Sequence, residues 1–151
     1  MSLVVDASVV VKWFVEENLV AEADGLLRRP ESLFAPDLVV TEVTNIAWKK
    51  VVRGHLEAEQ AEFIAASVHL GQLDLVPSTM LHQRALAIGL EIQHSIYDCL
   101  YLALAERLGN PLVTADERLI GKLEGSPYAH LAAHLSTYAA SEAPEDGATE
   151  P

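Results

Sequence analysis

The chain has 151 residues, half of them hydrophobic, a length that permits one sizeable core but is short for two independent domains. Its 22 Asp and Glu residues against 10 Lys and Arg residues give a formal net charge of -12. This charge excludes a general nucleic-acid clamp, which needs a basic surface. A single cysteine excludes an intramolecular disulfide and indicates a reducing, cytoplasmic compartment.

The N-terminal half alternates between short apolar runs and helical patterns. An apolar, mostly β-branched run ends at Asp6, which predicts a buried strand followed by a loop. Asp6 and Lys12 interrupt the apolar N-terminus, so we expect neither membrane insertion nor secretion. We predict strands over residues 3–5 and 32–35, and helices over residues 9–15 (capped by Ser8), 19–27 and 38–52 (ending before Gly54).

The C-terminal half continues the same alternation. Gly89 is the expected end of one helix, and Ser95 is the expected cap of the next. We predict helices over residues 58–70, 79–88 and 96–107, and strands over residues 73–76, 112–114 and 130–133. Strands separated by helices are typical of an α/β fold with a mainly parallel sheet.

Four acidic residues occupy positions that favour a shared site. Asp6 and Asp116 follow predicted strands, and ligands of open α/β sheets bind at the carboxyl ends of the strands. Glu42 and Asp98 interrupt apolar helix faces that should point toward the core. Buried carboxylates are costly unless they meet cations or hydrogen bonds. Carboxylate oxygens are the ligands of hard cations such as Mg²⁺ or Mn²⁺, which serve phosphoryl-transfer chemistry.

Each acid alone also has an ordinary structural explanation. Asp6 and Asp116 could cap loops, and Glu42 could tilt to solvent. Asp98 could interact with the dipole at the start of its helix. The four positions together favour the metal site.

Four segments resemble the motifs of the PIN-domain nucleases, and most closely those of the VapC-type toxins. They are VVDASVVVKWF with Asp6, PDLVVTEVTNIAWK with Glu42, SIYDCLYLALAE with Asp98, and LVTADERL with Asp116. Their order and spacing agree with the family over residues 3–119. Cys99 departs from the family, which often has a small residue such as Ala at this position.

The resemblance implies a three-layer α/β/α domain over residues 1–140, with a central, mainly parallel sheet of four to five short strands. The composition of residues 141–151, which are polar and acidic and include Pro and Gly, predicts a disordered acidic tail. It implies that Asp6, Asp98 and Asp116 hold Mg²⁺ or Mn²⁺, with Glu42 as a further ligand or as an acid that orients water. Ser8, Asn45 and Thr114 would support these residues.

The activity implied by the resemblance is metal-dependent endonucleolytic hydrolysis of structured RNA of the tRNA or rRNA class. The chain would be the toxin of a toxin-antitoxin pair, a homodimer held inactive by its cognate antitoxin.

Other functions stay open on the sequence alone. A housekeeping ribonuclease and a non-catalytic interaction module of the same fold are the main alternatives. A phosphatase with Asp6 as nucleophile is disfavoured because Ala7 and Ser8 follow without a second acid. A nucleotide-binding domain is disfavoured because no glycine-rich loop follows the first strand.

Overall fold

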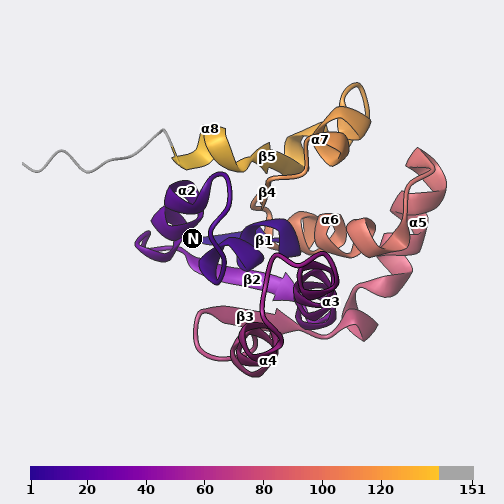
Figure 1. The fold of residues 1–151 in the computed structure, drawn as a ribbon. Helices are drawn as coiled ribbons and strands as arrows, with labels where there is room; N and C mark the ends of the chain where they lie inside the picture. Colours follow the sequence, from indigo (N-terminus) through magenta and orange to yellow (C-terminus); the bar gives the residue numbers. More distant parts are fainter. Residues whose placement is uncertain (140–151) are drawn as a thin grey trace, which may run out of the picture.

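The computed structural model describes residues 1–139, which contain a five-stranded sheet whose neighbouring strands are all parallel. The strand order β3-β2-β1-β4-β5 places the first strand at the centre of the sheet (Figure 1). The strands are β1 (Ser2–Val5), β2 (Ser32–Pro36), β3 (Leu73–Val76), β4 (Leu112–Thr114) and β5 (Ala132–His134).

Helices cover both faces of this sheet (Figure 1). Crossover connections between parallel strands are right-handed, so links that run in opposite directions across the sheet place their helices on opposite faces. Between β1 and β3 the chain forms α1 (Ala7–Val10), η1 (Val11–Trp13), α2 (Val20–Leu27), α3 (Leu38–Val52) and α4 (Ala58–Ser67). Between β3 and β5 it forms η2 (Ser78–Met80), α5 (His82–Ile92), α6 (Ile96–Leu108), α7 (Glu117–Leu123) and η3 (Ala129–Leu131). The prediction of a three-layer α/β/α fold is confirmed.

The strand order creates a binding position at the carboxyl ends of β1 and β4. From β1 the chain turns toward β2, whereas from β4 it turns toward β5 on the other side. The loops after these two adjacent strands therefore diverge, and such a switch point is where open α/β sheets bind their ligands. Asp6 follows β1 directly, and Asp116 follows β4 after one residue.

The core lies around β1 and α6. Leu3, Val4 and Val5 of β1 are fully buried, and residues 99–105 of α6 are all buried. Helix α6 contacts β1, β2 and β4. A helix that is apolar around most of its circumference must be covered on most sides. Polar groups in α6 therefore need specific partners.

The first helix starts earlier than predicted, at Ala7, and is shorter, since it gives way to η1 after Val10. Its N-cap is Asp6, whose side chain accepts a hydrogen bond from the Ser8 amide. The prediction of Ser8 as the cap is therefore wrong. An acid directly after a strand satisfies the free amides of the helix that follows.

The predicted end of a helix at Gly89 is also wrong, because Gly89 lies inside α5. A Cβ atom at this position would lie 2.7 Å from Ile96 Cδ1 and 2.9 Å from the His94 carbonyl oxygen. The glycine therefore permits close packing of the chain that begins α6. The helix ends instead at Ile92, followed by Gln93 with a φ of 55°.

Further differences concern element ends and short helices. Helix α4 stops at Ser67 rather than at residue 70, and β5 begins two residues later than predicted. Helices α7 and α8 (Leu135–Ala139) were not predicted, because they are short and weakly patterned. The predicted boundary at residue 140 and the tail over 141–151 lie outside the described residues.

Within residues 1–139, no helix has the length and apolar character that a membrane crossing requires.

A buried ion-pair group ties the first helical segment to α3. Glu17 accepts hydrogen bonds from Lys12 Nζ and from Lys50 Nζ, each at 2.9 Å. Lys12 is only 9% exposed. Partial burial acts to raise the pKa of Glu17, but the hydrogen bonds from Lys12 and Lys50 outweigh it and hold the pKa below its ordinary value. Both lysines are therefore already paired with the same carboxylate.

Glu17→Gln should destabilise the fold by about 1–2 kcal/mol at pH 7, since it leaves Lys12 buried without a counter-charge. A lowered folded-state pKa contributes stability that is complete above the unfolded value of about 4.3 and is lost as the pH falls through the folded value. The difference between parent and variant should therefore shrink below about pH 4. Urea unfolding at several pH values measures it. The exposed neighbour Glu16→Gln is the control; equal effects of both substitutions would contradict the assignment.

Candidate active site

Asp6 is the innermost acid of the site. It follows the central strand β1, caps α1 and is 9% exposed. Its Oδ1 accepts hydrogen bonds from the Ser8 amide at 3.1 Å and from Ser8 Oγ at 2.5 Å, and its Oδ2 accepts one from Thr114 Oγ1 at 2.5 Å. Both oxygens of this buried carboxylate are therefore held by hydroxyl groups, as its burial demands.

The two hydroxyl groups also join the loops after β1 and β4. Ser8 Oγ accepts a hydrogen bond from the Ala115 amide, and Thr114 Oγ1 accepts one from the Asp116 amide, both at 3.0 Å. Thr114 is fully buried at the end of β4. The structure thus brings Ser8 and Thr114 into contact with Asp6, as the sequence predicts.

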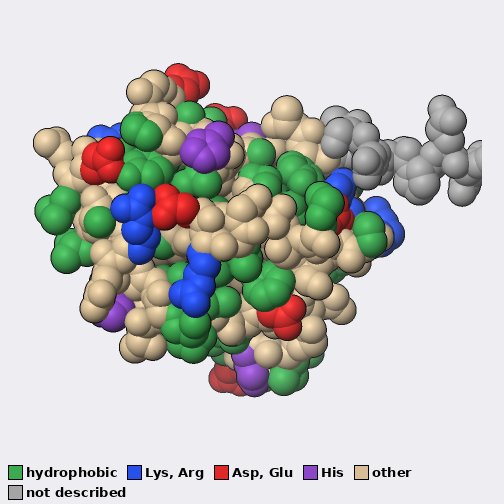
Figure 2. Space-filling view, turned by 180° about the vertical axis from the view of Figure 1, so that it is seen from behind, with side chains coloured by type: hydrophobic (Ala, Val, Ile, Leu, Met, Phe, Trp, Pro, Cys, Tyr) green, Lys and Arg blue, Asp and Glu red, His purple; other side chains and the backbone are tan. Residues whose placement is uncertain are grey.

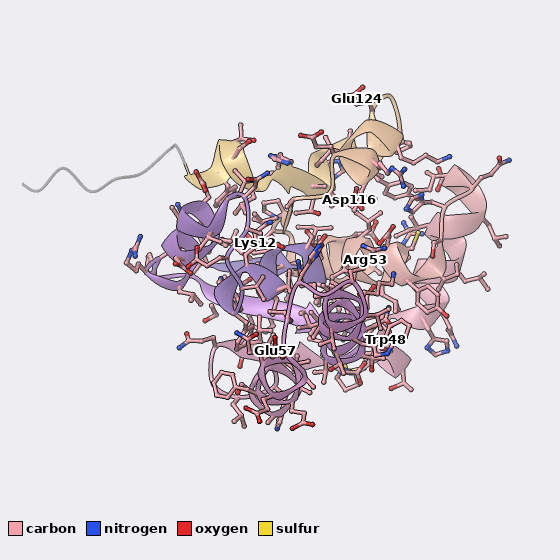
Figure 3. All side chains as sticks on the ribbon, in the orientation of Figure 1. Lys12, Trp48, Arg53, Glu57, Asp116 and Glu124 are labelled. Atoms are coloured by element: carbon pink, nitrogen blue, oxygen red, sulfur yellow. The ribbon has the colours of Figure 1, made fainter. Side chains whose placement is uncertain are left out.

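Asp116 is the N-cap of α7 and lies just beyond the end of β4 (Figure 3). Its Oδ1 accepts hydrogen bonds from the amides of Arg118 and Leu119, at 2.9 and 3.3 Å. Within residues 1–139 its Oδ2 has no hydrogen bond. Capping fixes the carboxylate at the carboxyl edge of the sheet and leaves one oxygen available.

Glu42 lies in the second turn of α3 and is half-buried, as its place in an apolar stripe predicts. Its Oε1 accepts a hydrogen bond of 2.5 Å from the hydroxyl of Tyr101, a core residue of α6. Burial raises the pKa of Glu42; the Tyr101 bond opposes this rise, and the charges of Asp98 and Asp6 add to it. Burial and the charge of Glu42 likewise raise the pKa of Tyr101, so the phenol remains a donor.

Asp98 lies in the first turn of α6, and its side chain is 35% exposed. Its Oδ2 lies 2.6 Å from His94 Nε2, which precedes α6. Asp98 and Tyr101 are three residues apart and share one helix face. The apolar face of α6 therefore carries two polar groups toward the switch point, as its interruption by Asp98 predicts.

Three of the four acids act on one another electrostatically. Burial, together with the charge of Asp98, raises the pKa of Asp6 to about 6, although the bonds from Ser8 and Thr114 oppose the rise. Asp6 and Asp98 also raise the pKa of Glu42. Within residues 1–139, none of the four acids forms an ion pair with a lysine or arginine. Within these residues the site therefore gathers carboxylates without a lysine or arginine to pair with them.

This donor set fits a hard divalent cation in chemistry and in charge, because it consists of carboxylate oxygens that repel one another. In residues 1–139, no three acidic, histidine or cysteine side chains are already arranged around one ion position. Mg²⁺ does not require such a cage, since it usually keeps several waters and binds through one or two carboxylates plus substrate phosphates.

Not every predicted residue joins this network, and two residues join it without having been predicted. Asn45 is exposed on α3 and, within the described part of the chain, forms no side-chain hydrogen bond with the acids. His94 contacts Asp98 and Tyr101 contacts Glu42, although neither was predicted as a site residue. For Tyr101 the available signal was its place three residues after Asp98, on the same face of α6. For His94 it was its place just before that helix.

Comparisons with known proteins show the family to which the chain is related. The family model of the PIN domain matches residues 3–123. The chain is 32% identical over 124 residues to Ribonuclease VapC3 from Pyrobaculum aerophilum, which covers 81% of this chain and 95% of that protein.

Solved structures show the same fold. The crystal structure of PAE2754 from Pyrobaculum aerophilum superimposes with a TM-score of 0.68 at 26% identity, over 93% of this chain and 88% of that one. A toxin-antitoxin complex from Klebsiella pneumoniae gives 0.60 at 19% identity, over 89% and 98%. VapC20 of Mycobacterium tuberculosis, a toxin that cleaves the sarcin-ricin loop, gives 0.61 at 18% identity, over 77% and 91%. From the family model, the sequence relative and the shared fold, we conclude that this chain belongs to the PIN-domain family.

Proposed function

We propose that this protein is a metal-dependent endoribonuclease that hydrolyses phosphodiester bonds in structured RNA of the tRNA or rRNA class. The observation that carries the proposal is the group of mutually repelling acids Asp6, Glu42 and Asp98 at the switch point of a PIN-domain sheet. The sequence relative named Ribonuclease VapC3 supports the choice of RNA.

In this proposal Asp6, Asp98 and Asp116 would hold Mg²⁺ or Mn²⁺. The ion would supply a bound water of lowered pKa and would neutralise charge on the phosphate. Ser8 and Thr114 keep Asp6 in place through its two oxygens. Glu42 would be a further ligand or would orient the attacking water.

The same proposal makes the protein the toxin of a toxin-antitoxin pair that acts in the cytoplasm. Two of the structural relatives are a toxin-antitoxin complex and a toxin. The net charge of -12 favours a cognate antitoxin with a basic segment, because opposite charges speed encounter and suppress wrong partners. A housekeeping ribonuclease would share the chemistry but would have no antitoxin partner.

Cleavage of RNA should require both the metal and the acids. Asp98→Asn preserves the shape of the side chain and removes its charge, so cleavage should fall at least about 100-fold. Purified protein is incubated with total RNA, tRNA and rRNA in Mg²⁺ or Mn²⁺, with EDTA in parallel. Asp74→Asn, at an exposed residue of the edge strand β3, is the matched control and should cleave normally.

Discrete cuts that vanish with EDTA and in Asp98→Asn would support the ribonuclease. Equal cleavage by the parent and by Asp98→Asn would contradict the proposal. No cleavage by the folded parent would favour a non-catalytic PIN-fold interaction module.

The cations most suited to bind RNA phosphates lie along α3. Lys12 and Lys50 are already paired with Glu17. Lys49 and Arg53 are exposed and have no ion pair within residues 1–139, and they follow Glu42 by about two and three helical turns on the same face. Figure 3 shows Arg53 at the end of α3. We propose that Lys49 and Arg53 on this face of α3 bind the RNA backbone and direct it toward the acids.

Arg53→Gln should raise the KM for RNA several-fold and leave kcat unchanged. The slope of the logarithm of RNA affinity against the logarithm of salt concentration should become shallower by about one. The control Arg28→Gln removes the same charge from the end of α2, where β2 begins at the opposite edge of the sheet. A similar change in both variants, as measured by KM against salt concentration, would mean a general charge effect and not a contact.

We also propose a homodimer through the α5 face. Leu86 and Leu90 are one turn apart on α5 and are 51% and 72% exposed. Figure 2 shows hydrophobic side chains along the left edge, where α5 lies in this view. An exposed apolar helix face of this kind favours protein association, and in a two-fold dimer it can pack on its own copy.

Light scattering should give twice the mass of one chain for the parent and the mass of a single chain for the double variant Leu86→Glu/Leu90→Glu. Phe63→Glu, at an equally exposed position on α4, should remain a dimer. A dimer that survives the α5 substitutions would place the interface elsewhere.

A further inference from the structure

The hydrogen bond between Tyr101 and Glu42 joins two helical layers. Helix α3 follows β2 on one face of the sheet, and α6 precedes β4 on the other face. The bond of 2.5 Å from the Tyr101 hydroxyl to Glu42 Oε1 therefore passes the carboxyl edge of the sheet, where the acids meet. Tyr101 is only 1% exposed, so its ring is fixed by the core.

The hydroxyl of Tyr101 is not needed for packing. Phenylalanine would fill the same space among apolar neighbours, whereas a buried hydroxyl costs free energy unless it has a partner. Glu42 is the hydrogen-bond partner of this hydroxyl. A tyrosine at this core position is therefore explained by what it does to Glu42.

The bond leaves Glu42 with one available oxygen. Oε1 accepts the Tyr101 hydroxyl, and within residues 1–139 Oε2 has no hydrogen bond. Asp98 and Asp116 show the same pattern, since one oxygen of each is held by His94 or by the amides of α7. The hydrogen bond fixes the orientation of the carboxylate, and the oxygen without a hydrogen bond is the one most open to an ion or to its water.

We propose that Tyr101 is a positioning residue that fixes Glu42 through Oε1 and so directs Oε2 toward the metal or its bound water. The inference rests on the proposed metal-dependent ribonuclease. Without the hydroxyl, the terminal torsion of Glu42 has broad, roughly two-fold freedom, and the carboxylate turns away from its working orientation.

The test compares Tyr101→Phe with Tyr97→Phe. Both substitutions remove one hydroxyl from α6, but Tyr97 is 64% exposed and its side chain forms no hydrogen bond within residues 1–139. Loss of a group that orients a ligand typically costs 10- to 100-fold in metal affinity or activity. Tyr101→Phe should therefore weaken Mn²⁺ binding or lower kcat for RNA by about 10-fold or more, with KM unchanged.

Mn²⁺ binding is followed without RNA, from the loss of the electron paramagnetic resonance signal of the free ion. Thermal unfolding checks that both variants stay folded. Tyr97→Phe should match the parent in Mn²⁺ binding, in RNA cleavage and in thermal unfolding. If Tyr101→Phe binds Mn²⁺ and cleaves RNA as the parent does, the proposal is overturned.

A double-mutant cycle separates positioning from a general structural effect. In a Glu42→Ala background there is no carboxylate to orient, so Tyr101→Phe should cause no further loss of Mn²⁺ affinity. An equal loss in both backgrounds would show that the hydroxyl acts on the fold and would overturn the proposal.

The outcomes also separate this inference from the proposed function. A parent that binds Mn²⁺ but does not cleave RNA would end the ribonuclease proposal, while the Mn²⁺ cycle still decides the role of Tyr101. A parent that neither binds Mn²⁺ nor cleaves RNA would overturn both.

Discussion

The carboxylate of Asp6, buried at the end of the central strand, is the constraint on which the site depends. Its two oxygens accept hydrogen bonds from the hydroxyl groups of Ser8 and Thr114. The same two hydroxyl groups accept hydrogen bonds from backbone amides of the loop after β4. The interaction that satisfies a costly buried charge therefore also fixes the distance between the two diverging loops. One small network therefore links the start of α1, the end of β4 and the placement of Asp116.

The charge distribution gives the chain its chemical character. An acidic protein binds RNA poorly through its overall field, yet Asp6, Glu42 and Asp98 act on one another where a divalent cation would offset most of their charge. Glu17 pairs with two of the lysines near α3, and Lys49 and Arg53 remain available on the face shared with Glu42. Catalysis and substrate attraction would thus both rely on a few local charges rather than on net charge.

The fold and the four acids were predictable because they depend on local patterns. Strand ends gave Asp6 and Asp116, and interrupted apolar faces gave Glu42 and Asp98. The role of Gly89 was not predictable, since it reflects contact with Ile96 across a tight turn between two helices. Tyr101 was hidden for a similar reason: its partner lies 59 residues away, and a tyrosine in an apolar helix looks like any other core residue. Helix α7 was missed because its seven residues carry little pattern.

The strand order also bears on synthesis. The central strand β1 emerges from the ribosome first, but its neighbour β4, which supplies Thr114, follows more than a hundred residues later. Until then Asp6 lacks one of its hydroxyl partners and Glu42 lacks Tyr101. Domains fold as units during translation, so the assembled acid cluster belongs only to a nearly complete chain. The ribosome itself contains RNA. A ribonuclease with this fold would therefore lack its assembled acids during most of its own synthesis on the ribosome.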